Sequence, residues 1–319
     1  MGVRAIYHVA GKKPDIARLS GRFPEIDFVL TRSDDELADE LSRCEFLVIN
    51  NADFSVEASR AAHASKTLKW IQFTSAGIDT AIRSGGFPAQ VLATNVSGLR
   101  AGNLSEHAFA MLLFLTRQLR AVEAGRAHRE FLKQELFPGM VSLRGRTMLI
   151  LGLGAIGQAA AQKAKGFGMR VTGISRAYRP GPLVDKVYPR EDSDEAFRQA
   201  DVLMIAAPSD DQTRGFVNAE KLALMKKGAI LVNVSRGDIV DEPALIEACR
   251  NRRIAGAGLD VMVEEPLPAD SELWRLDNVI VTPHVGGAGS DQLAQLLDRV
   301  AENVARYLAG EQLESIVSS

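Results

Sequence analysis

Hydrophobic and polar positions alternate in blocks along the chain: short apolar runs are followed by stretches with apolar residues at helical spacing. In the first hundred residues the helical spacing is seen at Asp34–Arg43 and Ser55–Ser65. The apolar runs between them are bounded by polar or turn residues and predict strands. These strands are Val3–Val9, Phe28–Leu30, Phe46–Ile49, Trp70–Phe73 and Val91–Thr94. Because strands that alternate with helices pair in parallel through right-handed crossovers, the pattern predicts a small α/β domain complete by about Asn95.

A long helical pattern separates this domain from a second series of strands. We predict one helix over Leu104–Phe131, capped by Asn103, with Glu106 three residues after the cap. The strands predicted beyond it are Thr147–Leu151, Arg170–Ile174, Val202–Ala206, Ala229–Val234, Gly256–Asp260 and Val279–Thr282. Strands in this number after a connecting helix predict a doubly wound parallel sheet of the dinucleotide-binding (Rossmann) kind.

The last helical pattern, Asp291–Leu308, is followed by no predicted strand. We expect this helix to return to the first domain, which then comprises residues 1–102 and 287–319 around a dinucleotide-binding domain at 103–286. No Pro/Gly-rich linker separates the two parts, so two hinge helices are expected to join them.

Composition agrees with two ordinary globular domains. The chain has 319 residues, of which 46% are hydrophobic, and its net charge of −2 comes from mixed acidic and basic residues. A nucleic-acid surface would show a basic stripe, and a membrane surface would need a comparable attraction, so neither partner is expected.

Cys44 and Cys249 stand far apart outside any motif, which favours reduced structural thiols and no metal site. With no apolar signal segment at the N-terminus, we expect a cytoplasmic protein.

The strongest local motif is Gly152-Leu-Gly154-Ala-Ile-Gly157. It follows the apolar run Met148–Leu151 and opens a helix near Ala155, the context in which each glycine has a reason. The glycines allow a tight turn, close approach of the backbone to a pyrophosphate, and close packing of helix on strand. The helix N-terminus would offer its amides to the phosphates. A glycine-rich turn without a ligand is the alternative interpretation.

The next predicted strand ends in residues that bear on which dinucleotide binds. An NAD enzyme usually has an acidic residue there for the ribose diol. This chain has Ser175 and Arg176, with Arg179 close behind. Because these groups can hydrogen-bond and neutralise a 2′-phosphate, we predict that NADP(H) is preferred over NAD(H). The alternative is that Arg176 is a solvated surface charge.

Three further segments end strands with charged groups, and the carboxyl ends of the strands are where ligands bind in such sheets. They bring Arg236, Glu265 and His284 to one edge. An arginine suits a substrate carboxylate, a histidine titrates near neutrality, and a neighbouring glutamate favours its protonated form. A lone arginine or histidine is usually a surface or structural residue, but three at one sheet edge indicate a catalytic site.

These motifs together resemble the D-isomer-specific 2-hydroxyacid dehydrogenases. The segments that carry the likeness are Gly152–Gly157, Asn233–Glu242, Asp260–Pro266 and Thr282–Gly286, with Thr74–Asp79 and Ser105–Ala108 fitting the family's first-domain loop and hinge helix. The likeness covers essentially the whole chain. It implies a nicotinamide-dependent interconversion of a small 2-oxo acid and its 2-hydroxy acid, in the cleft between a Rossmann domain and a smaller flavodoxin-like substrate domain.

The resemblance also implies roles for single residues. Arg236 would hold the substrate carboxylate and carbonyl, His284 would be the general acid of the reduction, and Glu265 would accept a hydrogen bond from His284. The substrate carboxylate would also be bound by the backbone amides of Ser75, Ala76 and Gly77. Asp260 would meet the nicotinamide carboxamide. The other expected cofactor contacts are Ala155, Ile156, Ala207, Pro208, Val234, Ser235 and Gly286, besides Arg236 and His284. A homodimer is expected as well.

Some positions depart from the family pattern. Ala206 stands where many members have histidine, and the segment 126–140 lacks a tryptophan common in relatives. Glyoxylate/hydroxypyruvate reductase is our first interpretation, with a dehydrogenase of a bulkier 2-oxo acid left open. Formate dehydrogenases typically pair the histidine with glutamine, so Glu265 disfavours that activity. The alternative from another class is a dinucleotide-sensing, non-catalytic regulator similar to corepressors with this fold.

Overall fold

The computed structural model describes residues 3–9, 16–175, 180–290 and 292–317. The chain divides into two compact units, Met1–Leu99 with Ser290–Ser319, and Arg100–Gly289. Both are α/β units built on a sheet whose strands are mainly parallel, so the predicted fold class is confirmed. The domain boundaries predicted from the sequence, 102/103 and 286/287, each lie three residues from a boundary between the compact units.

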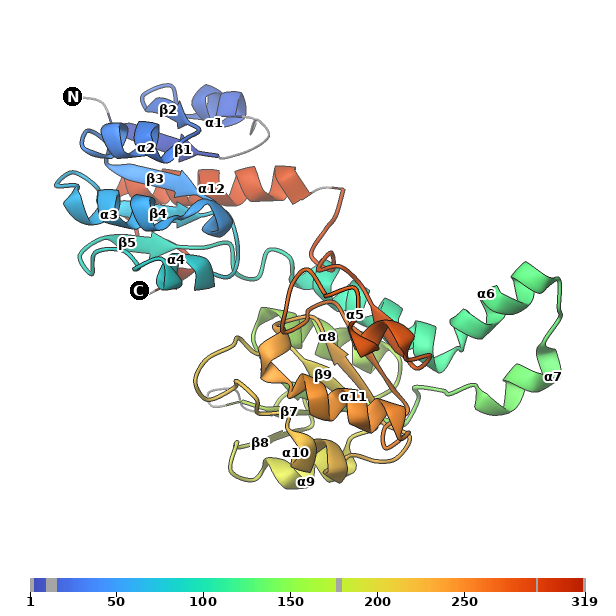
Figure 1. Cartoon of the computed structure of the whole chain (residues 1–319). Helices are drawn as coiled ribbons and strands as arrows, with labels where there is room; N and C mark the ends of the chain where they lie inside the picture. The colour runs from blue at the N-terminus through green and yellow to red at the C-terminus, as the bar shows by residue number, and fades with distance from the viewer. Residues whose placement is uncertain (1–2, 10–15, 176–179, 291, 318–319) are drawn as a thin grey trace. The chain divides into compact units, whose positions relative to one another are not determined.

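The first unit contains a six-stranded sheet (Figure 1). Its strands are β1 (Arg4–His8), β2 (Asp27–Thr31), β3 (Phe46–Ile49), β4 (Trp70–Phe73), β5 (Leu92–Thr94) and β13 (Ile316–Val317). They lie in the order β13-β5-β4-β3-β1-β2, and the first five in the chain reproduce the flavodoxin-like order. The expectation of no strand after the last helix is wrong: β13 pairs antiparallel with β5, Ile316 opposite Thr94. A strand of two residues is too short to show any periodicity.

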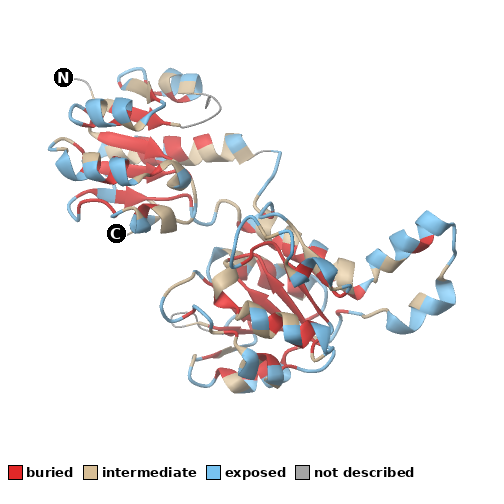
Figure 2. Ribbon diagram, in the orientation of Figure 1, coloured by how far each residue is buried: buried red, intermediate tan, exposed pale blue. Residues whose placement is uncertain are grey.

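Helices cover both faces of this sheet. They are α1 (Ile16–Arg22), α2 (Asp34–Leu41), α3 (Val56–Ala64), α4 (Asp79–Arg83) and α12 (Gln292–Ala309), with a 3-10 turn η1 (Asn51–Asp53). Successive strand residues point to opposite faces. Leu47 and Ile49 therefore pack with α2 and α3, whereas Phe46 and Val48 pack with α1 and α12. The last helix thus completes the core of the first unit. Figure 2 shows the strands as the buried layer.

The second unit contains a seven-stranded, fully parallel sheet. Its strands are β6 (Thr147–Leu151), β7 (Arg170–Ile174), β8 (Lys186–Tyr188), β9 (Val202–Ile205), β10 (Ile230–Asn233), β11 (Gly256–Leu259) and β12 (Val279–Val281). The order β12-β11-β10-β9-β6-β7-β8 is the doubly wound Rossmann order, extended by one strand. The six predicted strands are all present. The edge strand β8 was missed because its three residues begin with an exposed lysine.

The helices of the second unit correct one prediction. They are α5 (Ala101–Thr116), α6 (Leu119–His128), α7 (Lys133–Leu136), α8 (Ala155–Gly166), α9 (Ser193–Gln199), α10 (Ala219–Leu224) and α11 (Glu242–Arg250), with short 3-10 turns η2 (Phe137–Gly139), η3 (Gly237–Ile239) and η4 (Glu272–Arg275). The single helix predicted over Leu104–Phe131 is wrong, because the chain breaks at Gln118, whose φ is +51°. The Gln118 side chain donates to the Leu136 carbonyl at 2.8 Å, a contact that no local pattern reveals.

The predicted cap of this helix is also wrong. The helix begins at Ala101, so Asn103 lies inside its first turn and Arg100 precedes it. The Asn103 side chain donates instead to the Ala288 carbonyl at 3.3 Å. Asn103 therefore binds a distant loop of the same unit and does not cap the helix.

Two negative expectations concern the described residues only. No helix among them is long and apolar enough to cross a membrane. In the same part of the chain, no group of three or more His, Cys, Asp or Glu side chains is arranged to hold a metal ion. Cys44 and Cys249 are buried free thiols, and burial raises the pKa of Cys44 to about 11 and that of Cys249 to about 12, so both stay protonated at neutral pH.

Candidate active site

Two glycines of the 152–157 loop are required by the chain itself. Gly152 follows β6 with φ +93°, and a Cβ there would lie 2.6 Å from the Ala207 backbone. A Cβ on Gly157, in the first turn of α8, would lie 2.0 Å from the Gly152 carbonyl oxygen. Since real Cβ atoms do not approach so closely, both positions must remain glycine for β6, β9 and α8 to pack as they do.

The middle glycine has no such internal reason. Gly154 precedes α8 with φ −73°, a value open to any residue, and a Cβ there would meet no atom within 4 Å. The open space lies at the N-terminus of a twelve-residue helix, where backbone amides lack intrahelical partners. This arrangement fits a pyrophosphate, because the anion can approach the backbone only where no side chain intervenes.

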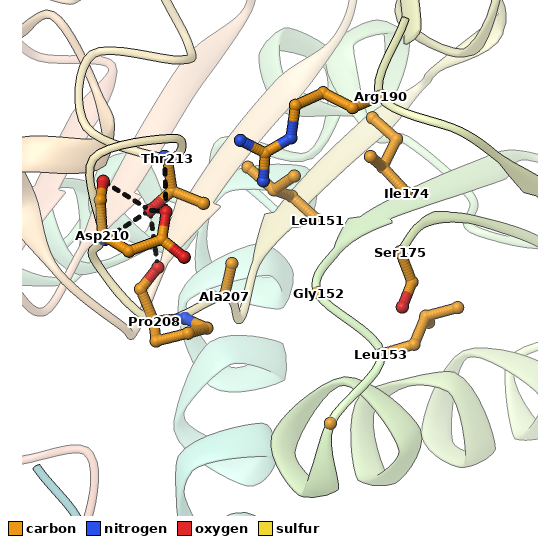
Figure 3. Close-up of a pocket in the computed structure, with 11 residues that line it drawn as sticks. Leu151, Gly152, Leu153, Ile174, Ser175, Arg190, Ala207, Pro208, Asp210 and Thr213 are labelled. Carbon is orange, nitrogen blue, oxygen red and sulfur yellow. Dashed lines mark hydrogen bonds between the residues drawn. The ribbon is translucent and has the colours of Figure 1, made fainter. Parts of the chain in front are cut away.

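A pocket opens beside this loop (Figure 3). It is lined by Leu151, Gly152, Leu153, Gly154, Ile174, Ser175, Arg190, Ala207, Pro208, Asp210 and Thr213. The ends of β6, β7 and β9 meet here, and the strand order reverses between β6 and β9. Ligands of open α/β sheets bind at such a switch point. Of the residues predicted to select the dinucleotide, Ser175 lines the pocket, whereas Arg176 and Arg179 lie outside the described residues.

Arg190 was missed by the sequence analysis. It follows the unpredicted strand β8, and its side chain reaches across the pocket towards the turn at Asp210 and Thr213 (Figure 3). Its guanidinium donates to the Gln212 carbonyl and lies 5.1 Å from the centre of the Phe216 ring. These contacts place a cation in the pocket that also contains Ser175.

Four further residues predicted to contact the cofactor lie on elements that begin or end beside this pocket. Ala155 and Ile156 are the first two residues of α8. Val234 and Ser235 follow β10, and the buried Ser235 hydroxyl donates to the Ala207 carbonyl, which joins the ends of β9 and β10.

Glu265 and His284 are in direct contact. Glu265 follows β11 and His284 follows the neighbouring strand β12. The His284 Nδ1 and Glu265 Oε2 atoms are 2.7 Å apart, and the other oxygen of Glu265 accepts from the Met262 amide at 3.0 Å. Because Glu265 engages Nδ1, the ring nitrogen available to exchange a proton with a bound molecule is Nε2. The His284 side chain is 51% exposed, so solvent or substrate can reach it.

Arg236 follows β10, which pairs with β11 in the same sheet. Its guanidinium donates to the Ser235 carbonyl at 2.8 Å, and the residue is partly buried. All three predicted catalytic residues therefore come from the ends of adjacent strands, and two of them, Glu265 and His284, are in direct contact.

An apolar cavity adjoins this pair. It is lined by Met262, Glu265, Pro266, Leu267, Trp274, Val281, Pro283 and His284. Six of these side chains are apolar, so the cavity suits a hydrophobic group placed next to the acid–base pair.

Asp260 is fully buried beneath the loop that carries His284. Its carboxylate accepts from the Val285 amide at 3.0 Å and from the Gly286 amide at 2.8 Å. The predicted contact to a nicotinamide carboxamide remains a prediction.

The predicted carboxylate-binding loop lies in the first unit. Ser75, Ala76 and Gly77 follow β4, and the Ser75 hydroxyl donates to the Gly77 carbonyl at 3.0 Å. Two residues that were not among the predicted site residues hold this loop. The backbone N–H of Asn51 donates to the Ser75 hydroxyl, and the side chain of Asn95 donates to the Ala76 carbonyl. For Asn51, the sequence feature that could have indicated this role is the pair Asn50-Asn51 directly after β3.

Comparison with known proteins defines the class. The family model for the D-isomer-specific 2-hydroxyacid dehydrogenase, NAD-binding domain, matches residues 109–286. A glyoxylate reductase of Pyrococcus furiosus is 36% identical over 240 residues, covering 72% of this chain and 69% of that protein. A D-3-phosphoglycerate dehydrogenase of Methanocaldococcus jannaschii is 30% identical over 306 residues, covering 95% of this chain and 57% of that protein.

Solved structures agree. A D-isomer-specific 2-hydroxyacid dehydrogenase family protein of Aeromonas salmonicida matches with a TM-score of 0.85 at 30% identity, over 99% of both chains. An NADPH-dependent glyoxylate/hydroxypyruvate reductase of Sinorhizobium meliloti, in complex with NADP and sulfate, matches with a TM-score of 0.84 at 28% identity, over 99% of this chain and 98% of that one. The chain belongs to the D-isomer-specific 2-hydroxyacid dehydrogenase family. It is a nicotinamide-dependent oxidoreductase that acts on the CH–OH group of 2-hydroxy acids.

Proposed function

We propose that this enzyme reduces a small 2-oxo acid, such as glyoxylate or hydroxypyruvate, with NADPH, and that His284 is the general acid. The observation that carries the proposal is the 2.7 Å contact between His284 Nδ1 and Glu265 Oε2. Both residues lie at the carboxyl edge of the sheet, the same edge at which the glycine loop follows β6. A histidine held in this way presents Nε2 in one orientation, which is what proton transfer to a bound carbonyl requires.

The residues divide the chemistry between them. A nicotinamide dinucleotide held at the glycine loop would supply the hydride that the carbonyl carbon of the substrate accepts. The carbonyl π electrons move to oxygen, which takes the proton of His284 Nε2 and becomes the hydroxyl group. Glu265 stabilises the imidazolium before the transfer, and Arg236 orients the carboxylate through its planar fork. The amides of Ser75, Ala76 and Gly77 are proposed to bind the same carboxylate.

The proposed preference for NADPH has two supports on the described residues. Ser175 stands after β7 where an NAD enzyme would have a carboxylate, and Arg190 brings a cation into the same pocket. Asp210 also lines the pocket, but its Oδ1 atom accepts from the Gln212 and Thr213 amides, both at 2.9 Å, which partly offsets its charge. The related reductase of Sinorhizobium meliloti is described as NADPH-dependent. We therefore add Arg190 to the residues proposed to bind the 2′-phosphate.

A bulkier 2-oxo acid is the second candidate substrate. The apolar cavity beside His284 favours it, because glyoxylate has no side chain to fill such a space. The relatives named above are reductases and dehydrogenases, which favours an enzyme over the dinucleotide-sensing regulator.

We also propose that the enzyme is a homodimer. Helices α6 and α7 lie apart from the sheet of their unit (Figure 1). One exposed phenylalanine stands between the two helices and another directly follows α7. Phe131 is 92% exposed and Phe137 75% exposed, an unfavourable state for a monomer in water. A cytoplasmic location stays a prediction.

The test is the loss of reduced-cofactor absorbance with glyoxylate, hydroxypyruvate, pyruvate and a branched 2-oxo acid, each with NADPH and with NADH. We expect turnover, with kcat/KM higher for NADPH by about tenfold or more, because a lost phosphate–arginine contact costs at least about 1.4 kcal/mol. The substrate ranking separates a small 2-oxo acid from a bulky one. No turnover across the panel, with NADPH binding established by fluorescence, would argue against the proposed reaction.

The variant His284→Gln tests the acid. We expect kcat to fall by about 10²- to 10⁴-fold with little change in the dissociation constant of NADPH, because general acid catalysis acts on the chemical step. His63→Gln, at an exposed position of α3, is the matched control and should keep full activity. Full turnover with an unchanged pH profile in His284→Gln would refute the assignment.

A further inference from the structure

The backbone of His284 is in an unusual conformation. Its φ is +54°, in the left-handed region that residues with a Cβ rarely adopt. Such a conformation is strained and persists only where the surrounding structure holds it in place. Some group in the second unit must therefore hold the loop from Thr282 to Gly286.

Asp260 is that group. It is fully buried, and it binds the loop on both sides of His284. Its Oδ1 atom accepts from the Thr282 hydroxyl at 2.6 Å and from the Val285 amide at 3.0 Å, and its Oδ2 atom accepts from the Gly286 amide at 2.8 Å. A buried carboxylate is costly unless donors surround it, so these bonds keep the loop and the carboxylate together.

Thr282 connects Asp260 to a residue from a different element. The Nε2 atom of His107, on α5, lies 2.8 Å from the Thr282 hydroxyl oxygen and 3.4 Å from Asp260 Oδ1. A threonine hydroxyl has one proton, and the short contact to Asp260 takes it. The hydroxyl must then accept from His107, so Nε2 of His107 carries a proton and the chain of bonds runs from His107 through Thr282 to Asp260.

The loop is also closely packed against the side chains beneath it. A Cβ on Gly286 would lie 2.7 Å from Asp260 Oδ2 and 3.0 Å from His107 Cδ2. The loop backbone thus rests directly on both side chains. It cannot move towards α5, and its two amides hold it against moving away.

We propose that His107 and Thr282 are positioning residues, which act through Asp260 to set the His284 ring against Glu265. The inference rests on the proposed role of His284 and extends it: neither residue is required to touch substrate. Loss of the Thr282 hydroxyl removes the shortest bond of Asp260 and its link to His107. Asp260 keeps its bonds to the Val285 and Gly286 amides, but the carboxylate and the loop that it binds can then shift together, which moves the His284 ring out of the geometry in which Nε2 faces the substrate.

The first arm of the test compares Thr282→Val with Thr282→Ser. Valine keeps the shape and lacks the hydroxyl, whereas serine keeps the hydroxyl. We expect Thr282→Val to lower kcat on the order of 10²-fold with NADPH affinity within a factor of about three, and Thr282→Ser to recover most of the activity, since small displacements of a catalytic group cost about this much. Equal losses in the two variants, or full activity in Thr282→Val, would overturn the proposal.

The second arm needs no turnover, so it separates this proposal from the proposed reaction. The chain has five histidines, and nitrogen NMR of ¹⁵N-histidine-labelled enzyme can be assigned for His284 with His284→Gln. We expect one sharp Nδ1–H signal, bonded to Glu265, in wild type and Thr282→Ser, and a broadened or doubled signal in Thr282→Val. An unchanged signal in Thr282→Val would count against the network whether or not any substrate is turned over.

Should Thr282→Val fail to fold, His107 provides the same comparison. His107→Phe keeps a ring without a donor, and His107→Gln can donate to Thr282 from its amide. The proposal requires His107→Gln to keep a sharper His284 signal than His107→Phe, and the reverse order would contradict it.

Discussion

Gly154 and Gly157 stand three residues apart in one motif but answer to different physical demands. A Cβ at Gly157 would overlap the Gly152 carbonyl, whereas a Cβ at Gly154 would stand in open space. The fold therefore requires glycine at position 157, whereas only the proposed dinucleotide requires it at position 154. The motif in the sequence does not distinguish them, because both requirements appear as the same letter.

Alanine substitutions should separate the two roles. We expect Gly154→Ala to leave the melting temperature almost unchanged and to weaken NADPH binding by about tenfold or more, because the methyl group occupies the approach of the pyrophosphate. Gly157→Ala should destabilise the second unit by about 1–3 kcal/mol, because α8 must move away from β6. Calorimetry and fluorescence titration measure both quantities. A stable Gly157→Ala, or a Gly154→Ala with wild-type affinity, would contradict this division.

Single residues also show where sequence reasoning stops. Glu265 and His284 were placed at one sheet edge because each follows an apolar run that reads as a strand. Arg190 was not found, since it follows an edge strand of three residues whose pattern is too short to detect. The His107–Thr282–Asp260 network joins His107 to Thr282, 175 residues further along the chain, and only folding brings them together.

At the scale of elements, helix α12 is joined to the first unit by one buried polar residue as well as by its apolar packing. Asn303 is fully buried and donates to Gln72 Oε1 in β4 at 2.8 Å, and its own oxygen accepts from the Glu314 amide at 2.9 Å. Gln72 in turn accepts from Thr94 of β5, which accepts from the Trp70 indole. This network ties the last helix to two strands near the start of the chain.

Breaking the network should destabilise the first unit. We expect Asn303→Leu to lower its free energy of unfolding by about 2–4 kcal/mol, because Gln72 and the Glu314 backbone lose buried partners. Leu293→Ala, at an exposed position of the same helix, is the control and should change stability by less than about 0.5 kcal/mol. Denaturant unfolding followed by tryptophan fluorescence reports on buried Trp70. An Asn303→Leu variant as stable as the control would mean that apolar packing alone docks the helix.

Element boundaries were predictable where a buried run was continuous and were missed where a distant contact decided them. β3, β4, β6 and β7 have the predicted bounds, because the first three are continuous runs of buried residues and β7 is such a run after the exposed Arg170. The break between α5 and α6 was not foreseen, because helical periodicity continues through Gln118 while its side chain binds Leu136 across a loop.

At the scale of the whole molecule, the arm formed by α6 and α7 should determine the oligomeric state. Exposed Phe131 and Phe137 would be covered in the proposed dimer. We expect sedimentation velocity to show a dimer for wild type, and Phe131→Ser with Phe137→Ser to shift it towards monomer by weakening the interface by several kcal/mol, about 1.5–3 kcal/mol for each buried aromatic side chain. Trp274→Ser, which removes an exposed aromatic residue elsewhere in the unit, is the control. A monomeric wild type would refute the proposal.

The succession of apolar runs and helical patterns was enough to derive two parallel α/β units, the Rossmann motif and the edge of the sheet at which charged residues gather. These features depend on local periodicity and on the rule that parallel strands end on one side, so they can be derived from neighbours in the chain. Tertiary structure alone decided the antiparallel strand β13, the break at Gln118, the position of Arg190 in the pocket beside the glycine loop and the support beneath His284. Each of these depends on hydrogen bonds or packing between residues far apart in sequence, whose free energy exists only once the fold has brought them together.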